Sequence, residues 1–177
     1  MLIGLLRGIN VGGQKRVPMG ELRALAERLG LGDVATYIQS GNLVFSSELA
    51  PRALELALEA AIFEHFGFQV PVVVRSARKL SAYVEQNPFL DVAESQPKFL
   101  QLGFAKQAVK PNLAQALEPY ARYGERIRAL DDALWIAFPQ GVGTSKLTPS
   151  VLDRMAGSSV TLRNYRTVLE VLAMAGH

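Results

Sequence analysis

The stretch LIGLLRGINVGG, residues 2–13, decides the fold of this chain. It is an apolar run that carries one arginine, Arg7, and then ends in Asn10, Gly12 and Gly13. Short apolar runs bounded by Asn and Gly are typical of buried strands followed by a turn. We therefore predict a central strand that leads into an exposed loop. Because this strand begins at residue 2, we expect no leader peptide.

The next residues predict the order strand, helix, strand, strand, helix, strand over residues 2–75. In the second of these helices, Leu54 and Leu58 predict a buried stripe, whereas Glu55, Glu59 and Glu64 are expected to face water. Proline and glycine at the ends of both helical patterns mark where each helix begins and ends. The predicted elements are a helix at 17–29, strands at 34–38 and 43–46, a helix at 51–66 and a strand at 70–75.

The second half predicts a related order of strand, helix, strand, strand, helix, helix. Ser76 is expected to cap a short helix that ends near Pro88. The remaining predicted elements are a strand at 98–106, a helix near 113–117, strands at 126–130 and 133–138, and helices at 149–156 and 162–175. We predict an α+β fold of two lobes with ferredoxin-like βαββα elements, antiparallel sheets and an extra C-terminal helix. The expected boundaries are an N-terminal lobe at 1–85, a linker at 86–97 and a C-terminal lobe at 98–177.

Composition excludes several chemistries. The 177 residues include no cysteine, so disulfides and thiolate sites are absent. The two histidines, His65 and His177, are not spaced as zinc ligands, and the sequence indicates no metal or other cofactor. No apolar run approaches the roughly 20 residues that span a bilayer, so we expect a cytoplasmic protein without a membrane partner. The net charge of +3, with five basic and two acidic groups in residues 1–28, favours anionic partners.

The glycine-rich loop after the first strand has two interpretations. Asn10, Gly12, Gly13 and Lys15 can present backbone N–H groups to an anion, or they can form a plain tight turn. The spacing matches neither the dinucleotide-binding glycine pattern nor the P-loop. Arg7, on the same strand face as several apolar residues, either pairs with an acidic group or contacts a ligand.

Two later motifs also leave alternatives open. The run GVGTSK, residues 141–146, lies between a strand and a helix, as phosphate-binding loops do, although a flexible connector explains it equally well. Arg163 and Arg166 fall near the predicted start of the last helix, where positive charge opposes the helix dipole. Acidic neighbours, a bound anion or packing of the arginine stems would resolve that conflict.

Recognised catalytic and nucleic-acid signatures are missing. Ser40 and Ser145 have no identifiable base, so the chain shows no catalytic constellation and whether it is an enzyme stays open. The first strand carries no aromatic side chain that could stack on a base, and the strand after the first hairpin turn offers only Phe45. The predicted sheet therefore lacks the aromatic platform that would support a nucleic-acid partner.

Six motifs occur in order along the chain: LLRGINVGG (5–13), VPM (17–19), TYIQSGNLVF (36–45), NPF (87–89), SKL (145–147) and LRNYRTV (162–168). Together they resemble one bacterial family, domain of unknown function 1697. The resemblance covers essentially the full length, with Tyr165 and Leu162 at positions where the family more often has Trp and Thr. It implies a two-lobed α+β fold and no assigned activity.

We predict that these polar positions converge between the lobes to bind an anionic, phosphate-bearing or nucleotide-like small molecule. One alternative is a protein interaction or homo-oligomerisation module, in which the same residues only hold the fold together, and the oligomeric state stays open. The other is an enzyme of unrecognised activity. The predicted ligand-binding residues are Arg7, Asn10, Gly12, Gly13, Lys15, Gln39, Ser40, Asn42, Ser145, Lys146, Arg163 and Asn164.

Overall fold

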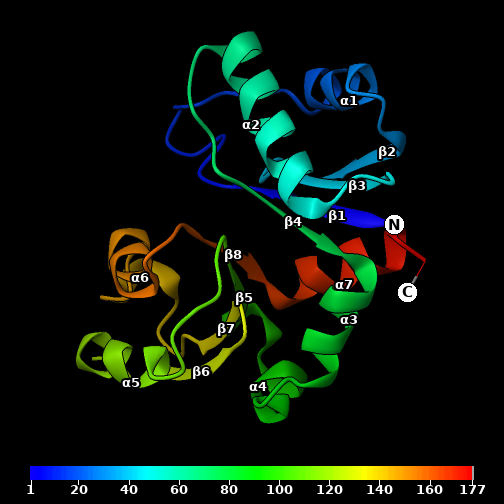
Figure 1. The fold of residues 1–177 in the computed structure, drawn as a ribbon. Coiled ribbons are helices and arrows are strands. Elements are labelled where there is room, and N and C mark those ends of the chain that lie inside the picture. The colour runs from blue at the N-terminus through cyan, green and yellow to red at the C-terminus, as the bar shows by residue number, and fades with distance from the viewer. Residues whose placement is uncertain (177) are drawn as a thin grey trace. The chain divides into compact units, whose positions relative to one another are not determined.

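The computed structural model describes residues 1–176, so His177 lies outside the described residues. The chain forms two compact units (Figure 1). Unit 1 contains residues 1–82 and the C-terminal residues from Glu170 onward, and unit 2 contains residues 83–169. The boundaries fall inside two helices, α3 (Ala77–Glu85) and α7 (Tyr165–Met174). Residues 90–95 of the predicted linker form a helix, α4 (Leu90–Ser95).

Unit 1 is built on a four-stranded antiparallel sheet in the order β2-β3-β1-β4. The helices α1 and α2 lie on the same side of this sheet (Figure 1). Apolar residues of both helices form one core with the side chains of β1, β3 and β4 that face them. The elements are β1 (Leu2–Leu6), α1 (Met19–Arg28), β2 (Gly32–Tyr37), β3 (Asn42–Ser46), α2 (Pro51–Phe66) and β4 (Val72–Ser76).

Unit 2 repeats this order with a second four-stranded antiparallel sheet, β6-β7-β5-β8. Its helices α5 and α6 contribute to a second core with β7 and β8. The predicted α+β class with two antiparallel sheets is confirmed. The elements are η1 (Pro97–Phe99), β5 (Leu100–Ala105), α5 (Leu113–Leu117), η2 (Glu118–Tyr120), β6 (Arg126–Leu130), β7 (Ala133–Ala137), η3 (Val142–Thr144), α6 (Pro149–Ala156) and β8 (Val160–Asn164).

The helix cap predicted at Ser76 is present, and Thr148 caps a second helix. The Ser76 hydroxyl accepts a hydrogen bond from the Lys79 N–H at 3.1 Å, at the start of α3. Thr148 accepts from the Val151 N–H at the start of α6. Both bonds satisfy N–H groups that a helix start leaves without an internal partner.

The prediction of a helix from residue 162 was wrong in its first turn. Residues 160–164 form β8, which pairs with β5 so that Arg163 lies opposite Leu102. Val160 belongs to the core and Leu162 packs against it, which gives the segment the alternation of a strand. Arg163 is therefore not at a helix start, and the predicted conflict with the helix dipole does not apply to it.

The prediction that Glu55 faces water was also wrong. Glu55 is 2% exposed, and its carboxylate accepts the Val74 N–H at 3.0 Å. One helical turn later, Glu59 accepts the Val72 N–H at 2.8 Å. β4 is the outermost strand of its sheet, so α2 satisfies two N–H groups that have no neighbouring strand. In unit 2, Asp153 of α6 accepts the Val160 N–H of β8 at 2.9 Å in the same way.

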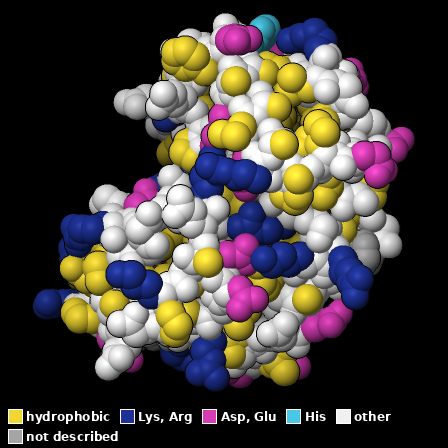
Figure 2. Space-filling model, in the orientation of Figure 1, with side chains coloured by type: hydrophobic (Ala, Val, Ile, Leu, Met, Phe, Trp, Pro, Cys, Tyr) yellow, Lys and Arg dark blue, Asp and Glu magenta, His cyan; other side chains and the backbone are white. Residues whose placement is uncertain are grey.

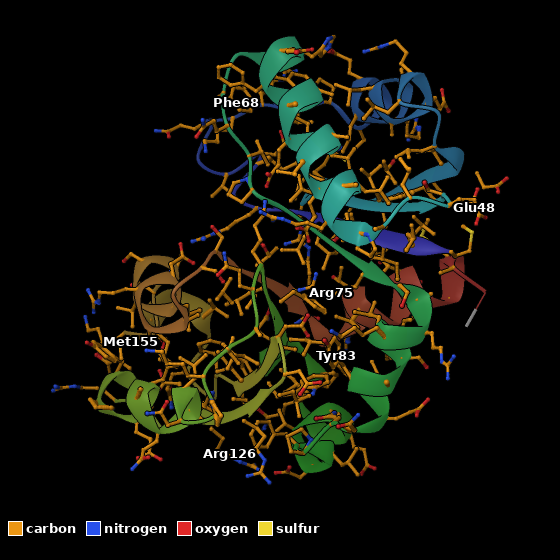
Figure 3. All side chains as sticks on the ribbon, in the orientation of Figure 1. Glu48, Phe68, Arg75, Tyr83, Arg126 and Met155 are labelled. Carbon is orange, nitrogen blue, oxygen red and sulfur yellow. The ribbon has the colours of Figure 1, made fainter. Side chains whose placement is uncertain are left out.

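Two arginines donate hydrogen bonds to the Glu55 carboxylate, which explains why a charged group is tolerated at this buried position. Arg75 of β4, which is labelled in Figure 3, donates to it at 3.3 Å and is itself 7% exposed. Arg52 donates at 3.0 Å from the same helix. A buried carboxylate needs such charged donors because burial otherwise opposes its ionisation.

Candidate functional site

The loop at residues 8–16 has an unusual backbone. Gly8, Asn10 and Gly12 have φ of 65°, 55° and 59°, and the residues between them do not have positive φ. Gly13 and Lys15 follow with φ of 75° and 47°. Gly12 and Gly13 are the two central residues of a tight turn, in which the Gln14 N–H donates to the Val11 carbonyl at 3.1 Å, and positive φ at both positions is typical of hairpin turns. Asn tolerates positive φ better than other side chains, which explains Asn10.

Asn10 holds the loop in this shape. Its side-chain oxygen accepts the Val17 N–H at 2.8 Å, and its amide donates to the Val17 carbonyl at 3.0 Å. The same amide donates to the Gln39 carbonyl at 2.8 Å, in the turn between β2 and β3. One side chain thus closes the loop and attaches it to a second turn distant in sequence.

The outer part of the loop is basic and open to solvent. Residues 11–16 are all exposed, and residues 1–20 contain three basic and no acidic side chains. The Lys15 ammonium group donates to the Gln69 carbonyl at 2.8 Å, which attaches the loop to the segment between α2 and β4. Within residues 1–176, the N–H groups of Gly12 and Gly13 donate to no protein acceptor.

The turn at residues 38–41 lies next to this loop. Asn42, fully buried, donates to the Tyr37 carbonyl at 2.9 Å and to the Ser40 hydroxyl at 3.1 Å. The Gly41 carbonyl accepts the Leu6 N–H at 2.8 Å, which ties the turn to β1. Asn42 therefore acts inside the turn, whereas Gln39 and Ser40 are exposed.

Arg7 follows directly after β1, at the base of the loop. Its N–H donates to the Pro71 carbonyl at 3.0 Å, and its side chain is half-buried. Unit 1 thus brings together eight of the predicted site residues around one loop and one turn. They are Arg7, Asn10, Gly12, Gly13, Lys15, Gln39, Ser40 and Asn42.

In unit 2, the Ser145 side chain is buried and forms hydrogen bonds with other groups of the protein. Its hydroxyl donates to the Glu125 carboxylate and accepts the Leu147 N–H at 3.1 Å. Burial raises the pKa of the Glu125 carboxyl group, but hydrogen bonds from Ser145 and from the Tyr123 N–H outweigh burial and hold the pKa below its ordinary value. A carboxylate at this position repels an anion, although the neighbouring Lys146 is exposed.

Arg163 and Asn164 lie at the end of β8 in unit 2. Arg163 is 8% exposed, donates to the Leu162 carbonyl at 2.9 Å, and has its pKa lowered to about 10 by burial. Asn164 donates to the Lys98 carbonyl at 2.9 Å and accepts the Arg166 N–H at 3.1 Å. Its amide thus ties the start of α7 to the segment before β5. Convergence of these residues with those of unit 1 stays a prediction.

Sequence reasoning missed two acidic residues that organise the polar clusters, Glu55 and Glu125. Glu55 and Glu59 lie one helical turn apart beside the buried stripe. This spacing fits two side chains that contact a sheet edge, but it fits a solvent-exposed helix face equally well. Glu125 carried no local signal, because its partner lies 20 residues away.

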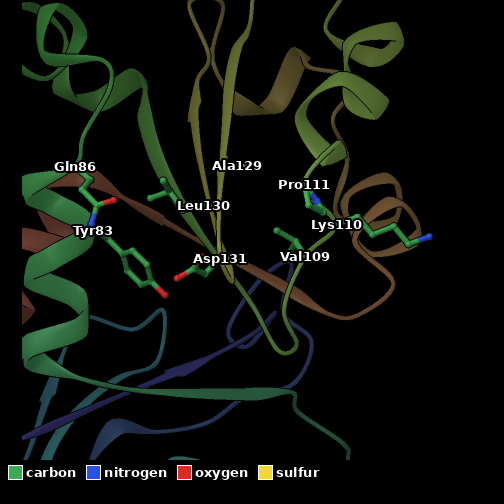
Figure 4. A pocket seen from close by; sticks show the side chains of 8 residues that line it. All are labelled: Tyr83, Gln86, Val109, Lys110, Pro111, Ala129, Leu130 and Asp131. Carbon is green, nitrogen blue, oxygen red and sulfur yellow. The ribbon is translucent and has the colours of Figure 1, made fainter.

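A cavity of about 410 Å³ lies in unit 2. Figure 4 shows Tyr83 and Asp131 pointing toward one another beside it, while the Lys110 side chain extends away. The Tyr83 hydroxyl donates to the neighbouring Asp132 carboxylate. Among residues 1–176, no three His, Asp or Glu side chains cluster as metal ligands would, and no helix combines the length and apolar character needed to cross a bilayer.

Replacing Asn10 with alanine is expected to lower the free energy of unfolding by about 2 kcal/mol, because three hydrogen bonds are lost and alanine is strained at positive φ. Asn10→Gly removes the same bonds without that strain and is expected to cost about 1 kcal/mol. Urea denaturation of both variants measures the difference. Equal losses would contradict a left-handed backbone at this position.

The Ser145→Ala variant is expected to lose about 1–2 kcal/mol at neutral pH. A depressed folded pKa stabilises the fold above the ordinary glutamate pKa, and this contribution is lost as the pH falls through the folded value. The difference in the free energy of unfolding between wild type and variant should therefore become smaller below about pH 4.3. The part due to the Leu147 N–H should remain at low pH.

Denaturant titrations from pH 7 to pH 3 measure this gap. Glu125→Gln is the control, since it removes the carboxylate and should abolish the pH-dependent part. A gap that stays constant over the whole range would rule out the proposed coupling between Ser145 and Glu125.

The fold and these contacts define a class of α+β proteins with two four-stranded antiparallel units. Residues 1–135 match the family described as "Protein of unknown function (DUF1697)", and the chain belongs to this family. It is also similar to the solved structure of the conserved bacterial protein SP0830 from Streptococcus pneumoniae. The two are 24% identical with a TM-score of 0.75, over 98% of this chain and 97% of that chain, and this likeness establishes the fold. The comparison with curated proteins finds no match.

Proposed function

We propose that this protein binds an anionic, phosphate-bearing small molecule at the loop formed by residues 8–16 of unit 1. The observation that carries the proposal is the exposed turn at Gly12 and Gly13, whose backbone N–H groups donate to no protein acceptor among residues 1–176. The shape is fixed by Asn10 before any ligand arrives, which reduces the entropy lost on binding. The repeated β-α-β-β-α-β order supports a ferredoxin-like interpretation of each unit, which is compatible with many functions.

Charge around the loop favours the same ligand class. Arg16 is exposed at the end of the loop, and the exposed Lys15 donates to the Gln69 carbonyl. An ammonium group has three donors, so the bond to Gln69 leaves Lys15 able to contact an anion. Exposed Gln39 and Ser40, attached through Asn10, supply directional hydrogen bonds for the rest of a nucleotide-like molecule.

Calorimetric titration with pyrophosphate and with ATP at low ionic strength tests the proposal. Arg16→Gln is expected to weaken binding about tenfold, because one charge-assisted hydrogen bond contributes about 1.5 kcal/mol. Arg128→Gln is the control: it removes the same charge from an exposed position on β6 and should leave the affinity unchanged. Affinity should also fall as salt is added.

Two outcomes would refute this function. One is the absence of heat and of any thermal shift with millimolar pyrophosphate and ATP. The other is equal loss of affinity in Arg16→Gln and Arg128→Gln, which would indicate diffuse attraction to the net positive charge instead of binding at the loop.

A further inference from the structure

The outward face of α2 carries an apolar stripe. Ala53, Leu56, Ala60 and Phe63 recur at intervals of three, four and three residues, which places them on one side of the helix. All four are exposed, and the two large side chains retain 53% and 50% of their surface. The stripe is distinct from the face that packs in the core of unit 1. Figure 2 shows hydrophobic side chains at the surface of this view, in the region where Figure 1 places α2.

The order of side chains along the stripe is small, large, small, large. A two-fold axis that crosses the stripe midway between Leu56 and Ala60 generates an antiparallel copy of the helix. It places Leu56 opposite Ala60 of the second copy and Phe63 opposite Ala53. Each large side chain then meets an alanine, which is how facing helix surfaces interdigitate without voids. A parallel arrangement would instead put the phenylalanines against each other.

The charged side chains beside the stripe match the same two-fold axis. The axis places Arg52, whose side chain is 59% exposed, opposite the exposed Glu64 of the second copy. Because a two-fold contact is reciprocal, the attractive pair occurs once at each end of the stripe. A parallel copy would bring arginine against arginine and glutamate against glutamate, which is unfavourable.

We propose that the outward face of α2 binds a second copy of this chain, with the two helices antiparallel. Specific stable interfaces bury about 1,200–2,000 Å², whereas the proposed contact uses one face of a single helix, so the expected dimer is weak, with a dissociation constant in roughly the micromolar range or above. Arg52 keeps its bond to Glu55 in this arrangement, because a guanidinium group has five donors.

Sedimentation velocity of the full chain over a range of concentrations tests the surface. The wild type is expected to shift toward the dimer as concentration rises. Leu56→Glu should abolish the shift, whereas Leu90→Glu, at an equally exposed leucine of α4, should leave it intact. A wild type that stays monomeric up to about 1 mM, or an unchanged shift in Leu56→Glu, would overturn the proposal.

Mixing charge variants tests the orientation. Arg52→Glu alone and Glu64→Arg alone each face like charge in their own dimers and should remain monomeric. Their equimolar mixture pairs opposite charges at both ends and should form a heterodimer. Circular dichroism confirms that each variant is folded, and should Arg52→Glu unfold because of its proximity to Glu55, Leu56→Glu and Glu64→Arg still decide the question. Two folded variants that fail to associate when mixed would exclude the antiparallel arrangement.

Discussion

Replacing Glu55 with alanine is expected to lower the free energy of unfolding by about 3–5 kcal/mol, which is the cost of removing one member of a buried ion pair. The substitution takes the carboxylate away from the Arg75 guanidinium group, itself 7% exposed. It also leaves the outward Val74 N–H without its acceptor. The free energy of unfolding of a native protein is only about 5–15 kcal/mol, so this loss is a large part of the total.

Urea denaturation monitored by circular dichroism measures this loss. Glu64→Ala is the matched control, since it removes an exposed carboxylate from the same helix and should change stability by less than about 0.5 kcal/mol. Glu55→Gln keeps the size and one acceptor and should fall between the two. A Glu55→Ala variant as stable as the control would mean that the buried ion pair contributes nothing.

Replacing Gly41 with alanine is expected to destabilise the protein by about 3 kcal/mol or more. Its φ is +79°, and a Cβ atom there would lie 2.7 Å from the Leu6 Cβ and 2.7 Å from the Ile9 Cδ1. Steric overlap in a packed region therefore adds to the roughly 1–2 kcal/mol that an L-residue loses in the left-handed conformation.

Gly67 provides the control for backbone strain alone. It has nearly the same φ, +78°, and a Cβ there would meet no atom within 4 Å. Gly67→Ala is accordingly expected to cost about 1 kcal/mol. Thermal and chemical denaturation of both variants separate the two contributions, and equal losses would show that the contact of Gly41 with β1 is looser than described. Because Gly41 supports the loop at residues 8–16 through Leu6, any phosphate affinity should fall with it.

Much of the fold was predictable from short-range patterns. Leu22 and Leu25 occur at helical spacing, and Pro51 and Gly67 bracket α2, so both helices of unit 1 could be placed from local signals. β8 could not, because Val160 to Asn164 run directly into α7 without a proline or glycine between them. The strand forms because β5 offers a free edge for pairing, which is a tertiary effect that overrides local pattern.

The site was predictable in part. Glycine and asparagine after the first strand predicted an exposed loop with a tight turn, and residues 11–16 are exposed and include the turn closed by the Gln14 N–H and the Val11 carbonyl. The partners of these residues were not predictable, since Asn10 reaches Gln39 across 29 positions and Ser145 reaches Glu125 across 20. Polar side chains carry no sequence period that identifies their partner, so their pairing becomes visible only in the folded chain.

The carboxylates that accept the outward N–H groups of β4 and β8 have a consequence for recognition. Peptides that bind by adding a strand to a sheet need those N–H groups as donors. Glu55, Glu59 and Asp153 occupy them with groups from the same chain. Strand addition and fibrillar self-assembly are thereby opposed along β4, where two N–H groups are occupied, and at the start of β8, where the Val160 N–H is occupied.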